Sequence, residues 1–517
     1  MRLHVAALWI FSLAFVLSSV VGQKNPHFMG NRTTMVHLFE WKWLDIAKEC
    51  ENFLGPKGYG GVQISPPNEN RVINSPSRPW WERYQPISYV LKTRSGTESE
   101  LRQMISRCQH AGVRVYADVV VNHMSASNPG KSLGTAGSTA YYDKKLYSDV
   151  PYGPADFHAP CIIHDYHNPT QVRTCQLNTL LDLNQTRPHV RDRIVKYMNH
   201  LIDCGVAGFR IDAAKHMLPQ DLHAIYGNLK NLNRTFNFPA GAKPYIYQEV
   251  IDLGGEAIKN SHYSQFGAVT EFKFSTEIGR VFHGRNQLRW LRNWGPDWSF
   301  LPTKDAIVFV DNHDNQRGHG AGGSDILTYK NGQNYKMAVI FMLAHPYGGV
   351  TRVMSSYSFE STDQGPPTTS DHRIKSPTSL PNGLCDTKAS GWVCEHRWPE
   401  IASMVKFRNL VAGKPVEHWW DNGGNQIAFS RGHIGFVALN NDSGSEMKVT
   451  LQTGLPAGHY CDILGGGRSA KAEVCVGRRF EVEHDGKMHV ELSRGPSAMA
   501  IHVAARVDVG HGTHGKH

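Results

Sequence analysis

Short, almost continuously apolar segments recur along the chain up to about residue 414, and helical patterns lie between most of them. Such segments are typical of parallel strands that are buried on both faces. The stretch ESELRQMISRCQHAG before the third segment has the spacing of an amphipathic helix. Eight strand–helix units predict an α/β fold, a (β/α)₈ TIM barrel whose functional residues sit at the carboxyl ends of the strands. The eight segments are TMVHLF from Thr34, GGVQIS from Gly60, VRVYADVVV from Val113, AGFRID from Ala207, PYIYQE from Pro244, AVTEFKF from Ala268, AIVFVD from Ala306 and GGVTRVM from Gly348.

Two parts of the chain depart from this alternation. Residues 122–182 are rich in Gly, Ser, Pro, Asp and Tyr and are too long for a simple loop, which predicts an inserted subdomain after strand 3. Over residues 415–505, apolar and polar positions alternate between Gly, Asn and Asp turns, which predicts a C-terminal antiparallel β-sandwich. The barrel is then expected over 23–121 and 183–414. Residues 506–517, which end in GHGTHGKH, are expected to form a flexible tail, with metal binding by its histidines as the less favoured interpretation.

The first 22 residues have the composition of a secretory signal peptide. Arg2 and His4 precede an apolar run from Val5 to about Leu17, and small residues follow up to Gly22. The run is short for a membrane span, and no later segment reaches the ~18–20 apolar residues that a span needs. We therefore expect a secreted, extracellular protein that does not associate with a membrane; an uncleaved anchor is the alternative.

The overall composition changes this picture little. The chain has 517 residues, of which 40% are hydrophobic and 19% charged, and this is ordinary for a soluble globular protein. The net charge is +10, but there is no block of Lys and Arg and no alternation of basic with aromatic residues, which argues against nucleic acid as a partner. A mildly basic, solvated surface is the simpler interpretation. A monomer is the default expectation.

Secretion favours disulfide bonds, and the chain has nine cysteines, so at least one stays unpaired if all bridges are internal. Cys204 is expected to be the unpaired one, because it ends an amphipathic helix just before Gly205, where a buried, inert thiol fits best. The sequence alone does not fix the connectivity of the others. The plausible pairs are Cys161–Cys175, Cys385–Cys394 and Cys461–Cys475, which are close in sequence, and Cys50–Cys108 over a longer range.

Three acidic residues, Asp212, Glu249 and Asp314, stand where predicted strands end. A carboxylate is costly at the end of so apolar a strand unless something uses it. Alternate residues of a strand share a face, so Arg210 and Asp212 should point into the barrel mouth together. Any one of these acids is more readily explained as a surface residue or a salt-bridge partner. Their common position favours glycoside hydrolysis, which needs two carboxylates flanking the scissile bond.

Four motifs around these residues resemble the signature regions of one enzyme family. They are DVVVNH (118–123), GFRIDAAKH (208–216), QEVI (248–251) and FVDNHDNQ (309–316). Together they are similar to animal-type α-amylases of glycoside hydrolase family 13, in its chloride-dependent group. The resemblance continues through HLFEWKW, RPWWERYQPISY, GHGAGG and WVCEHRW, so it covers about residues 23–505.

The resemblance implies a role for each acid. Asp212 matches the nucleophile, Glu249 matches the general acid/base, and Asp314 matches the third acid, which orients and stabilises the distorted sugar. His123 and His313 match histidines that hydrogen-bond the sugar. A structural role is the alternative for a lone histidine.

The resemblance also implies residues that line the substrate cleft. Aromatic platforms suit the apolar faces of glucose rings, although a WW pair taken alone is more often part of a core. Residues 318–323 resemble a mobile loop that closes over substrate, with glycines that would permit the motion. The aromatic residues that match are Trp80, Trp81 and Tyr84, and the polar substrate contacts that match are Gln85, Lys215 and His319.

Two ion sites are implied as well. One structural Ca²⁺ would take side-chain oxygens and backbone carbonyls, with a turn-forming asparagine as the alternative for Asn122 alone. One activating Cl⁻ would offset two buried arginines and favour the protonated, acid form of Glu249; a pair between Arg352 and a carboxylate is the alternative. The calcium set is Asn122, Arg173, Asp182 and His216, and the chloride set is Arg210, Asn312 and Arg352.

These expectations define a secreted, endo-acting α-amylase that hydrolyses internal α-1,4-glucosidic bonds of starch, glycogen and maltooligosaccharides with retention of configuration. An α-glucosidase or transglycosylase on the same scaffold is the alternative enzyme. A catalytically inactive, amylase-like binding protein is the alternative from another class, but such a protein should have lost an acid or carry a membrane anchor.

Overall fold

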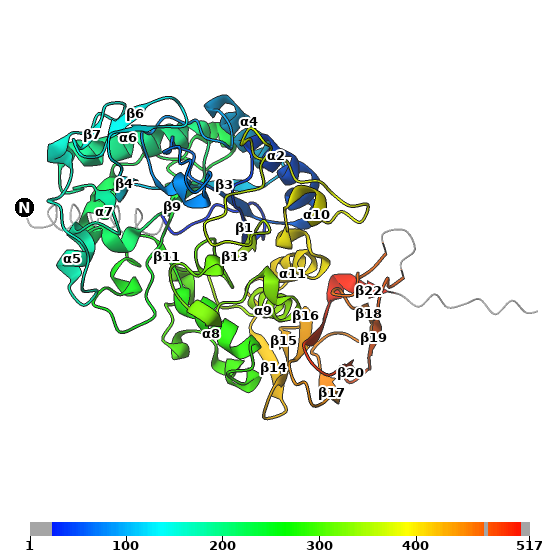
Figure 1. The fold of residues 1–517 in the computed structure, drawn as a ribbon. Helices are drawn as coiled ribbons and strands as arrows, with labels where there is room; N and C mark the ends of the chain where they lie inside the picture. Colours follow the sequence, from blue (N-terminus) through cyan, green and yellow to red (C-terminus); the bar gives the residue numbers. More distant parts are fainter. Residues whose placement is uncertain (1–22, 470–473, 508–517) are drawn as a thin grey trace, which may run out of the picture.

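The eight predicted segments form the strands of one closed barrel. The computed structural model describes residues 23–469 and 474–507, so the expected signal peptide (1–22) lies outside the described residues. The parallel strands close in the order β1-β13-β12-β11-β10-β9-β3-β2, which confirms the predicted (β/α)₈ barrel (Figure 1). Their bounds are β1 Thr34–Leu38, β2 Gly61–Ile64, β3 Arg114–Val119, β9 Gly208–Ile211, β10 Tyr245–Gln248, β11 Ala268–Thr270, β12 Ala306–Val308 and β13 Val350–Ser355.

Two predicted strands were too long; one of them is β12, which ends at Val308, three residues before the end of AIVFVD. In the segment AVTEFKF, β11 ends at Thr270 and the helix α8 (Phe272–Phe282) follows almost at once. Glu271 separates the two elements, because its side chain accepts a hydrogen bond from the Lys273 amide and so caps the helix. The apolar residues beyond Glu271 therefore belong to a buried helical face, which a short apolar run does not distinguish from a strand.

Helices surround the barrel, and local signals set their ends. α4 (Glu98–His110) begins with a capping box between Thr97 and Glu100. α6 (Pro188–Cys204) ends at Gly205, whose φ of 107° is the left-handed conformation expected of a glycine C-cap. The other α-helices of the described residues are α2 (Trp43–Glu49), α3 (Gly55–Lys57), α5 (Pro169–Thr174), α7 (Pro219–Gly227), α9 (Gln333–Ala344), α10 (Thr387–Ser390) and α11 (Pro399–Leu410).

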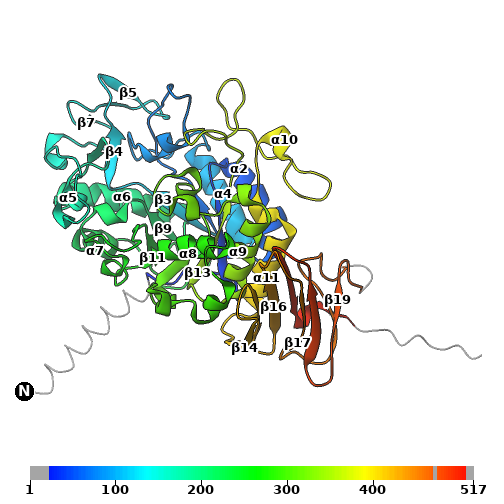
Figure 2. The same cartoon turned by 60° about the horizontal axis from the view of Figure 1, so that its bottom comes forward.

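The segment between β3 and α6 carries small sheets of its own. β4 (His123–Ala126) pairs antiparallel with β8 (Leu180–Asp182). A second, three-stranded sheet contains β5 (Lys131–Leu133), β6 (Thr139–Tyr141) and β7 (Leu146–Tyr147). Figure 2 shows these strands and the C-terminal sheets at opposite ends of the molecule.

Two antiparallel sheets follow α11, with the orders β14-β15-β16-β21 and β17-β20-β19-β18-β22. Side chains such as Phe436 and Met488 form a hydrophobic core between them, which is the predicted sandwich. β22 covers the first two residues of the segment expected to be a flexible tail, because it pairs with β18; residues 508–517 lie outside the described part. The strands are β14 Val416–Asp421, β15 Gln426–Arg431, β16 Gly435–Asn440, β17 Met447–Gln452, β18 Gly458–Cys461, β19 Arg479–Val482, β20 Lys487–Leu492, β21 Ser497–His502 and β22 Arg506–Val507.

Covalent links tie neighbouring segments together. Cys204 is the unpaired cysteine and is buried, as expected. No helix within the described ranges is long and apolar enough to cross a membrane. The four disulfides match the expected pairs: Cys50–Cys108, Cys161–Cys175, Cys385–Cys394 and Cys461–Cys475.

Candidate active site

Asp212 occupies the turn directly after β9, two residues beyond Arg210. Its amide donates to the carbonyl of Val119 on the neighbouring strand (3.1 Å). Ala213 then takes a left-handed conformation (φ 47°), which turns the chain away from the strand. The Asp212 carboxylate accepts a hydrogen bond from Arg210 Nη1 at 2.9 Å. The two side chains thus share a face, as the alternation of strand residues predicts.

The Arg210 guanidinium connects three carboxylates. Nη1 donates to both oxygens of Asp118 (2.7 and 2.9 Å) and to Asp212, while Nη2 donates to Glu249. Glu249 directly follows β10, and its second oxygen accepts from the Ala213 amide at 2.9 Å. Because β9 pairs with both β3 and β10, three adjacent strands deliver their acids to one cation.

Asp118 was not among the predicted site residues, although it lies in the DVVVNH motif. It is fully buried, and the Tyr84 hydroxyl donates to its Oδ2 at 3.0 Å. The strand register places Asp118 opposite Arg210, so pairing the predicted strands β3 and β9 could have found it. Asp118 is a positioning residue, because it holds the guanidinium and the Tyr84 ring in place.

Asp314 lies in the loop after β12, further along the chain than the strand end at which we expected it. Asn312 shapes this loop, since its Oδ1 accepts from the amides of Asp314 (3.1 Å) and Asn315 (2.7 Å). The Asp314 side chain is 23% exposed and is therefore the most open of the three predicted acids. His313 Nε2 lies 3.6 Å from its Oδ1.

Burial and like charge raise the pKa values in this cluster. Removal from water is the largest cause for Asp118, Asp212 and Asp314. The Glu249 carboxylate adds to the rise, and Arg210 opposes it. The pKa of Asp314 reaches about 7. Burial therefore favours the protonated forms of these three carboxyls while Arg210 favours the charged forms, and glycoside hydrolysis needs both charged and protonated carboxyls in one site.

An aromatic wall stands beside the acids. Tyr84 stacks on His313 with ring centroids 5.0 Å apart and 6° between the planes. The Trp80 ring meets that of His313 edge-on, with centroids 5.5 Å apart. Trp80 is only 5% exposed, so it packs inside the wall and offers little surface to a substrate. Trp81 and Tyr84 are partly exposed, and Trp81 Nε1 donates to Asp363 Oδ1 at 3.0 Å. Burial lowers the pKa of His313 well below its usual value, which keeps its ring neutral.

His123 and Gln85 already have protein partners. His123 Nε2 lies 3.0 Å from the Tyr84 carbonyl, and Nδ1 lies 3.1 Å from the Asn122 amide nitrogen. Burial lowers the pKa of His123 to about 4, so the ring is neutral and donates through one nitrogen only. Gln85 Oε1 accepts from the Ala126 amide at 3.1 Å. Both side chains hold the backbone that surrounds the aromatic wall.

Lys215 and His319 are the remaining polar residues of the predicted substrate contacts. Lys215 Nζ donates to the Ile251 carbonyl at 2.8 Å and to Glu256. His319 is exposed, and its ring lies 5.7 Å from that of Trp80. Four of the glycines in residues 318–323 have φ between 51° and 98°, a backbone conformation that other residues adopt only with strain. The loop therefore depends on its glycines for its shape.

The four residues of the expected calcium set occur as two neighbouring pairs. Asn122 and Asp182 meet where β4 pairs with β8, and Asn122 Oδ1 is buried without a hydrogen-bond partner. Arg173 and His216 meet where α5 packs on the 3₁₀ helix Ala214–His216, with His216 Nδ1 2.9 Å from the Val172 carbonyl. Burial raises the pKa of Asp182 to about 6, and His158 opposes this at 2.6 Å. An orphaned amide oxygen beside a buried carboxylate is a donor set that fits Ca²⁺.

The expected anion set is centred on Arg352 of β13. Its Nη1 donates to Gln63 Oε1 at 2.9 Å, and its Nε is buried without a partner. Within the described residues Arg352 has no ion pair, so the alternative of a carboxylate partner is not what the structure shows. Burial lowers its pKa, and the charge of Arg210 lowers it further. Arg210 is already bonded to three carboxylates, contrary to the expectation of two unpaired arginines, so the site that fits a small anion is the buried guanidinium of Arg352 with its unpartnered Nε.

Arg317 is a second residue that sequence reasoning missed. It donates to the His313 carbonyl at 2.8 Å, and its guanidinium lies over the rings of Phe359 (4.3 Å), Tyr357 (4.8 Å) and Phe39 (5.1 Å). Through these cation–π contacts Arg317 stabilises the packing of the aromatic rings around His313. No periodic pattern or motif marks a residue of this kind in advance.

The acids lie at the mouth of a (β/α)₈ barrel, next to a wall of aromatic side chains. This combination is that of a glycoside hydrolase. Family models agree: "Alpha amylase, catalytic domain" matches residues 83–351, and "Alpha amylase, C-terminal all-beta domain" matches residues 419–504. The chain belongs to the α-amylase family.

Individual relatives support this placement over the full length. An α-amylase of Tribolium castaneum is 54% identical over 506 residues, covering 98% of this chain and 100% of the relative. An α-amylase of Tenebrio molitor is 53% identical over 487 residues, covering 94% and 100%. Among solved structures, a glutamine variant of α-amylase I from Eisenia fetida in complex with maltohexaose has a TM-score of 0.87 and 44% identity, covering 92% of this chain and 98% of that one.

Proposed function

We propose that the protein is a secreted, endo-acting α-amylase that cleaves internal α-1,4-glucosidic bonds of starch and glycogen with retention of configuration. The observation that carries this proposal is the shared guanidinium of Arg210, which holds Asp212 and Glu249 at the ends of adjacent strands. The relatives named α-amylase, and the maltohexaose complex of the earthworm enzyme, support the substrate class.

In the proposed mechanism, Glu249 donates its proton to the glycosidic oxygen while an Asp212 oxygen attacks the anomeric carbon. The bond to the leaving chain breaks, and a covalent glycosyl ester forms on Asp212. Glu249, now ionised, takes a proton from water, whose oxygen attacks the same carbon and releases Asp212. Asp314 binds hydroxyls of the distorted ring, and Tyr84 and Trp81 offer faces for neighbouring sugars.

Product analysis tests the function. Starch should be cut at internal bonds, so its viscosity should fall before much reducing sugar appears, and mixed maltooligosaccharides should accumulate as α-anomers. Glucose as the sole early product would support an α-glucosidase, and longer products would support a transglycosylase. No turnover of starch, by protein that is folded by circular dichroism, would support an inactive binding protein.

A bound Ca²⁺ would join the Asn122–Asp182 pair to the Arg173–His216 pair, through two side-chain oxygens and two carbonyls. The ion would supply positive charge to this donor set and hold the segment between β3 and α6 against the barrel. Among the described residues, the one ion-pair partner of the Asp182 carboxylate is His158, at 2.6 Å.

Removal of calcium is expected to lower the thermal stability. Excess EGTA should reduce the melting temperature, since an ion at about 1,000 times its dissociation constant contributes about 4 kcal/mol to folding. Asp182→Asn should abolish most of this EGTA effect, and Asp149→Asn, an exposed aspartate in the same segment, should leave it intact. Equal melting temperatures of the wild type in excess Ca²⁺ and after exhaustive dialysis against EGTA would contradict the calcium site.

A bound Cl⁻ would lie between Arg210 and Arg352, with the Asn312 amide as a further donor. The anion would offset the charge of Arg352, since Arg210 already has carboxylate partners, and it would favour the protonated form of nearby acids. This proposal rests on the orphaned Nε of Arg352 and on its lack of a carboxylate partner within the described residues.

Chloride removal is expected to reduce starch hydrolysis by about tenfold or more, which corresponds to ~1.4 kcal/mol in the barrier. The assay replaces chloride with acetate at constant ionic strength. Arg352→Gln should lose the response to chloride, whereas Arg234→Gln, at an exposed position, should keep it. A wild type with the same activity and pH profile in both buffers would rule out the activating anion.

A further inference from the structure

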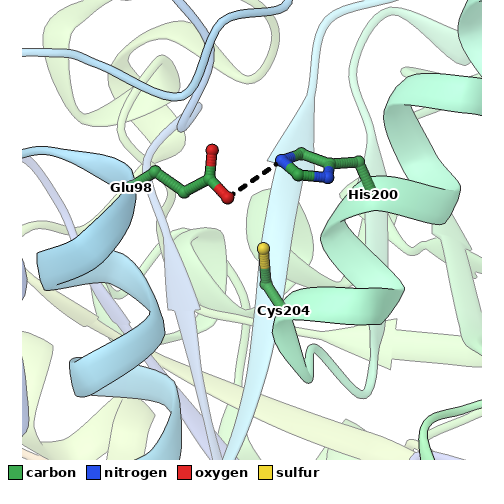
Figure 3. Close-up of side chains that lie close together, drawn as sticks. All are labelled: Glu98, His200 and Cys204. Carbon is green, nitrogen blue, oxygen red and sulfur yellow. Dashed lines mark ion pairs between the residues drawn. The ribbon is translucent and has the colours of Figure 1, made fainter.

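A cluster of metal-ligand side chains lies outside the active site, between α4 and α6. Glu98 is the first residue of α4, and His200 and Cys204 lie one turn apart on α6 (Figure 3). A carboxylate oxygen, an imidazole nitrogen and the thiol sulfur all lie within 4.8 Å of one another. We propose that Glu98, His200 and Cys204 form a binding site for one thiophilic divalent cation of the Zn²⁺ type.

The donor atoms select the class of ion. Sulfur, imidazole nitrogen and carboxylate oxygen together suit Zn²⁺, Co²⁺ or Cd²⁺, whereas Ca²⁺ and Mg²⁺ prefer oxygen alone. Three protein ligands leave a fourth, tetrahedral position for water. Cys204 is buried and forms the floor, while the side chains of Glu98 and His200 are 38% and 43% exposed and leave a way in from solvent.

The side chains are already aimed at one another without an ion. His200 Nε2 lies 3.1 Å from Glu98 Oε1, so the two groups meet at the place where the cation would sit. Figure 3 shows the Cys204 sulfur directed towards this pair. Arg102 also bonds Glu98 Oε1 at 2.8 Å, and since the Glu98 contacts in the described part of the chain use Oε1, Oε2 remains for the ion. Because the three donor atoms already lie within 4.8 Å of one another, the cation would bind with little movement of the helices.

Binding must also remove the thiol proton. Burial raises the pKa of Cys204 to about 12, with Glu98 and Asp203 adding to the rise and Arg102 opposing it. A coordinated thiol is deprotonated, so cation binding releases protons and becomes tighter as pH rises. A bound cation would then cross-link α4 to α6, two helices that pack against each other on the barrel.

Cobalt titration provides a readout that belongs to this site alone. The other eight cysteines are in disulfides, so Cys204 is the one thiol that can give a sulfur-to-cobalt charge-transfer absorbance. Histidines near the C-terminus, or oxygens of a calcium site, bind Co²⁺ without producing this band. The expected result is a band that saturates at one cobalt per protein and disappears when Zn²⁺ is added in excess.

Variants distinguish two hypotheses for this cluster. Either it is a metal site, or Cys204 is an inert buried thiol next to a surface ion pair. Cys204→Ser should lose the band, and His200→Ala should weaken cobalt binding by about tenfold or more. His110→Ala removes an exposed histidine from α4 and should change nothing. His200 lies at the surface, so its variant tests the site even if Cys204→Ser folds poorly. A wild type with no thiolate band at saturating Co²⁺ or Cd²⁺, or a His200→Ala titration that matches the wild type, would overturn the proposal.

Discussion

Asp212→Asn is expected to reduce starch hydrolysis by roughly 10⁴-fold or more, because an amide oxygen is too weak a nucleophile to form the glycosyl ester. The substitution keeps the size of the side chain. It also removes one acid from a cluster in which Asp118 and Glu249 still bond Arg210, so the fold should remain intact. Initial rates of reducing-sugar release measure the loss, and circular dichroism checks the fold.

Asp192→Asn is the matched control, since it makes the same chemical change at an exposed position of α6. Its rate should equal that of the wild type. A folded Asp212→Asn protein that kept more than a small fraction of the wild-type rate would show that another group attacks the sugar. Asp118 is the least suitable replacement, because its two oxygens are occupied by Arg210 and Tyr84.

The barrel could be predicted from the sequence because each strand is mostly apolar, is buried on both faces and is bounded by a helix or a turn. β11 shows the limit of that pattern most clearly. Phe272 and Phe274 are buried in the helix α8, and their apolar character alone does not distinguish a helix from a strand, whereas the capping bond of Glu271 marks the start of the helix.

The sequence could predict those site residues that lie in a recognisable motif or at the end of a predicted strand. Asp212 and Glu249 directly follow their strands, whereas Asp314 lies in a loop whose shape comes from the side chain of Asn312. Arg317 escaped prediction because its role consists of contacts to rings from distant parts of the chain, and such contacts exist only after folding. Asp118 was missed although the register of β3 against β9 places it opposite Arg210.

Glu249→Gln is expected to lower starch hydrolysis by about 10³-fold, since the amide cannot donate a proton to the leaving oxygen or take one from water. The loss should be much smaller for an aryl maltooligosaccharide whose nitrophenolate leaves without a proton. Bond cleavage then depends on Asp212 alone, and the second step, attack of water on the ester, becomes slow. A burst of nitrophenolate followed by slow turnover is the expected time course.

Azide distinguishes the two carboxyl roles through the configuration of its product. With Glu249→Ala and the aryl substrate, azide should attack the anomeric carbon of the Asp212 ester, break its bond to the carboxylate and give an α-glycosyl azide. With Asp212→Ala, azide should enter in place of the missing carboxylate and give the β-azide directly. Nuclear magnetic resonance reads the anomer in each case. Arg210 donates a hydrogen bond to Asp212 and another to Glu249, so the two carboxylates have nearly equivalent surroundings in the site without substrate. A β-azide from Glu249→Ala would therefore reverse the two assignments while leaving the glycoside hydrolase intact.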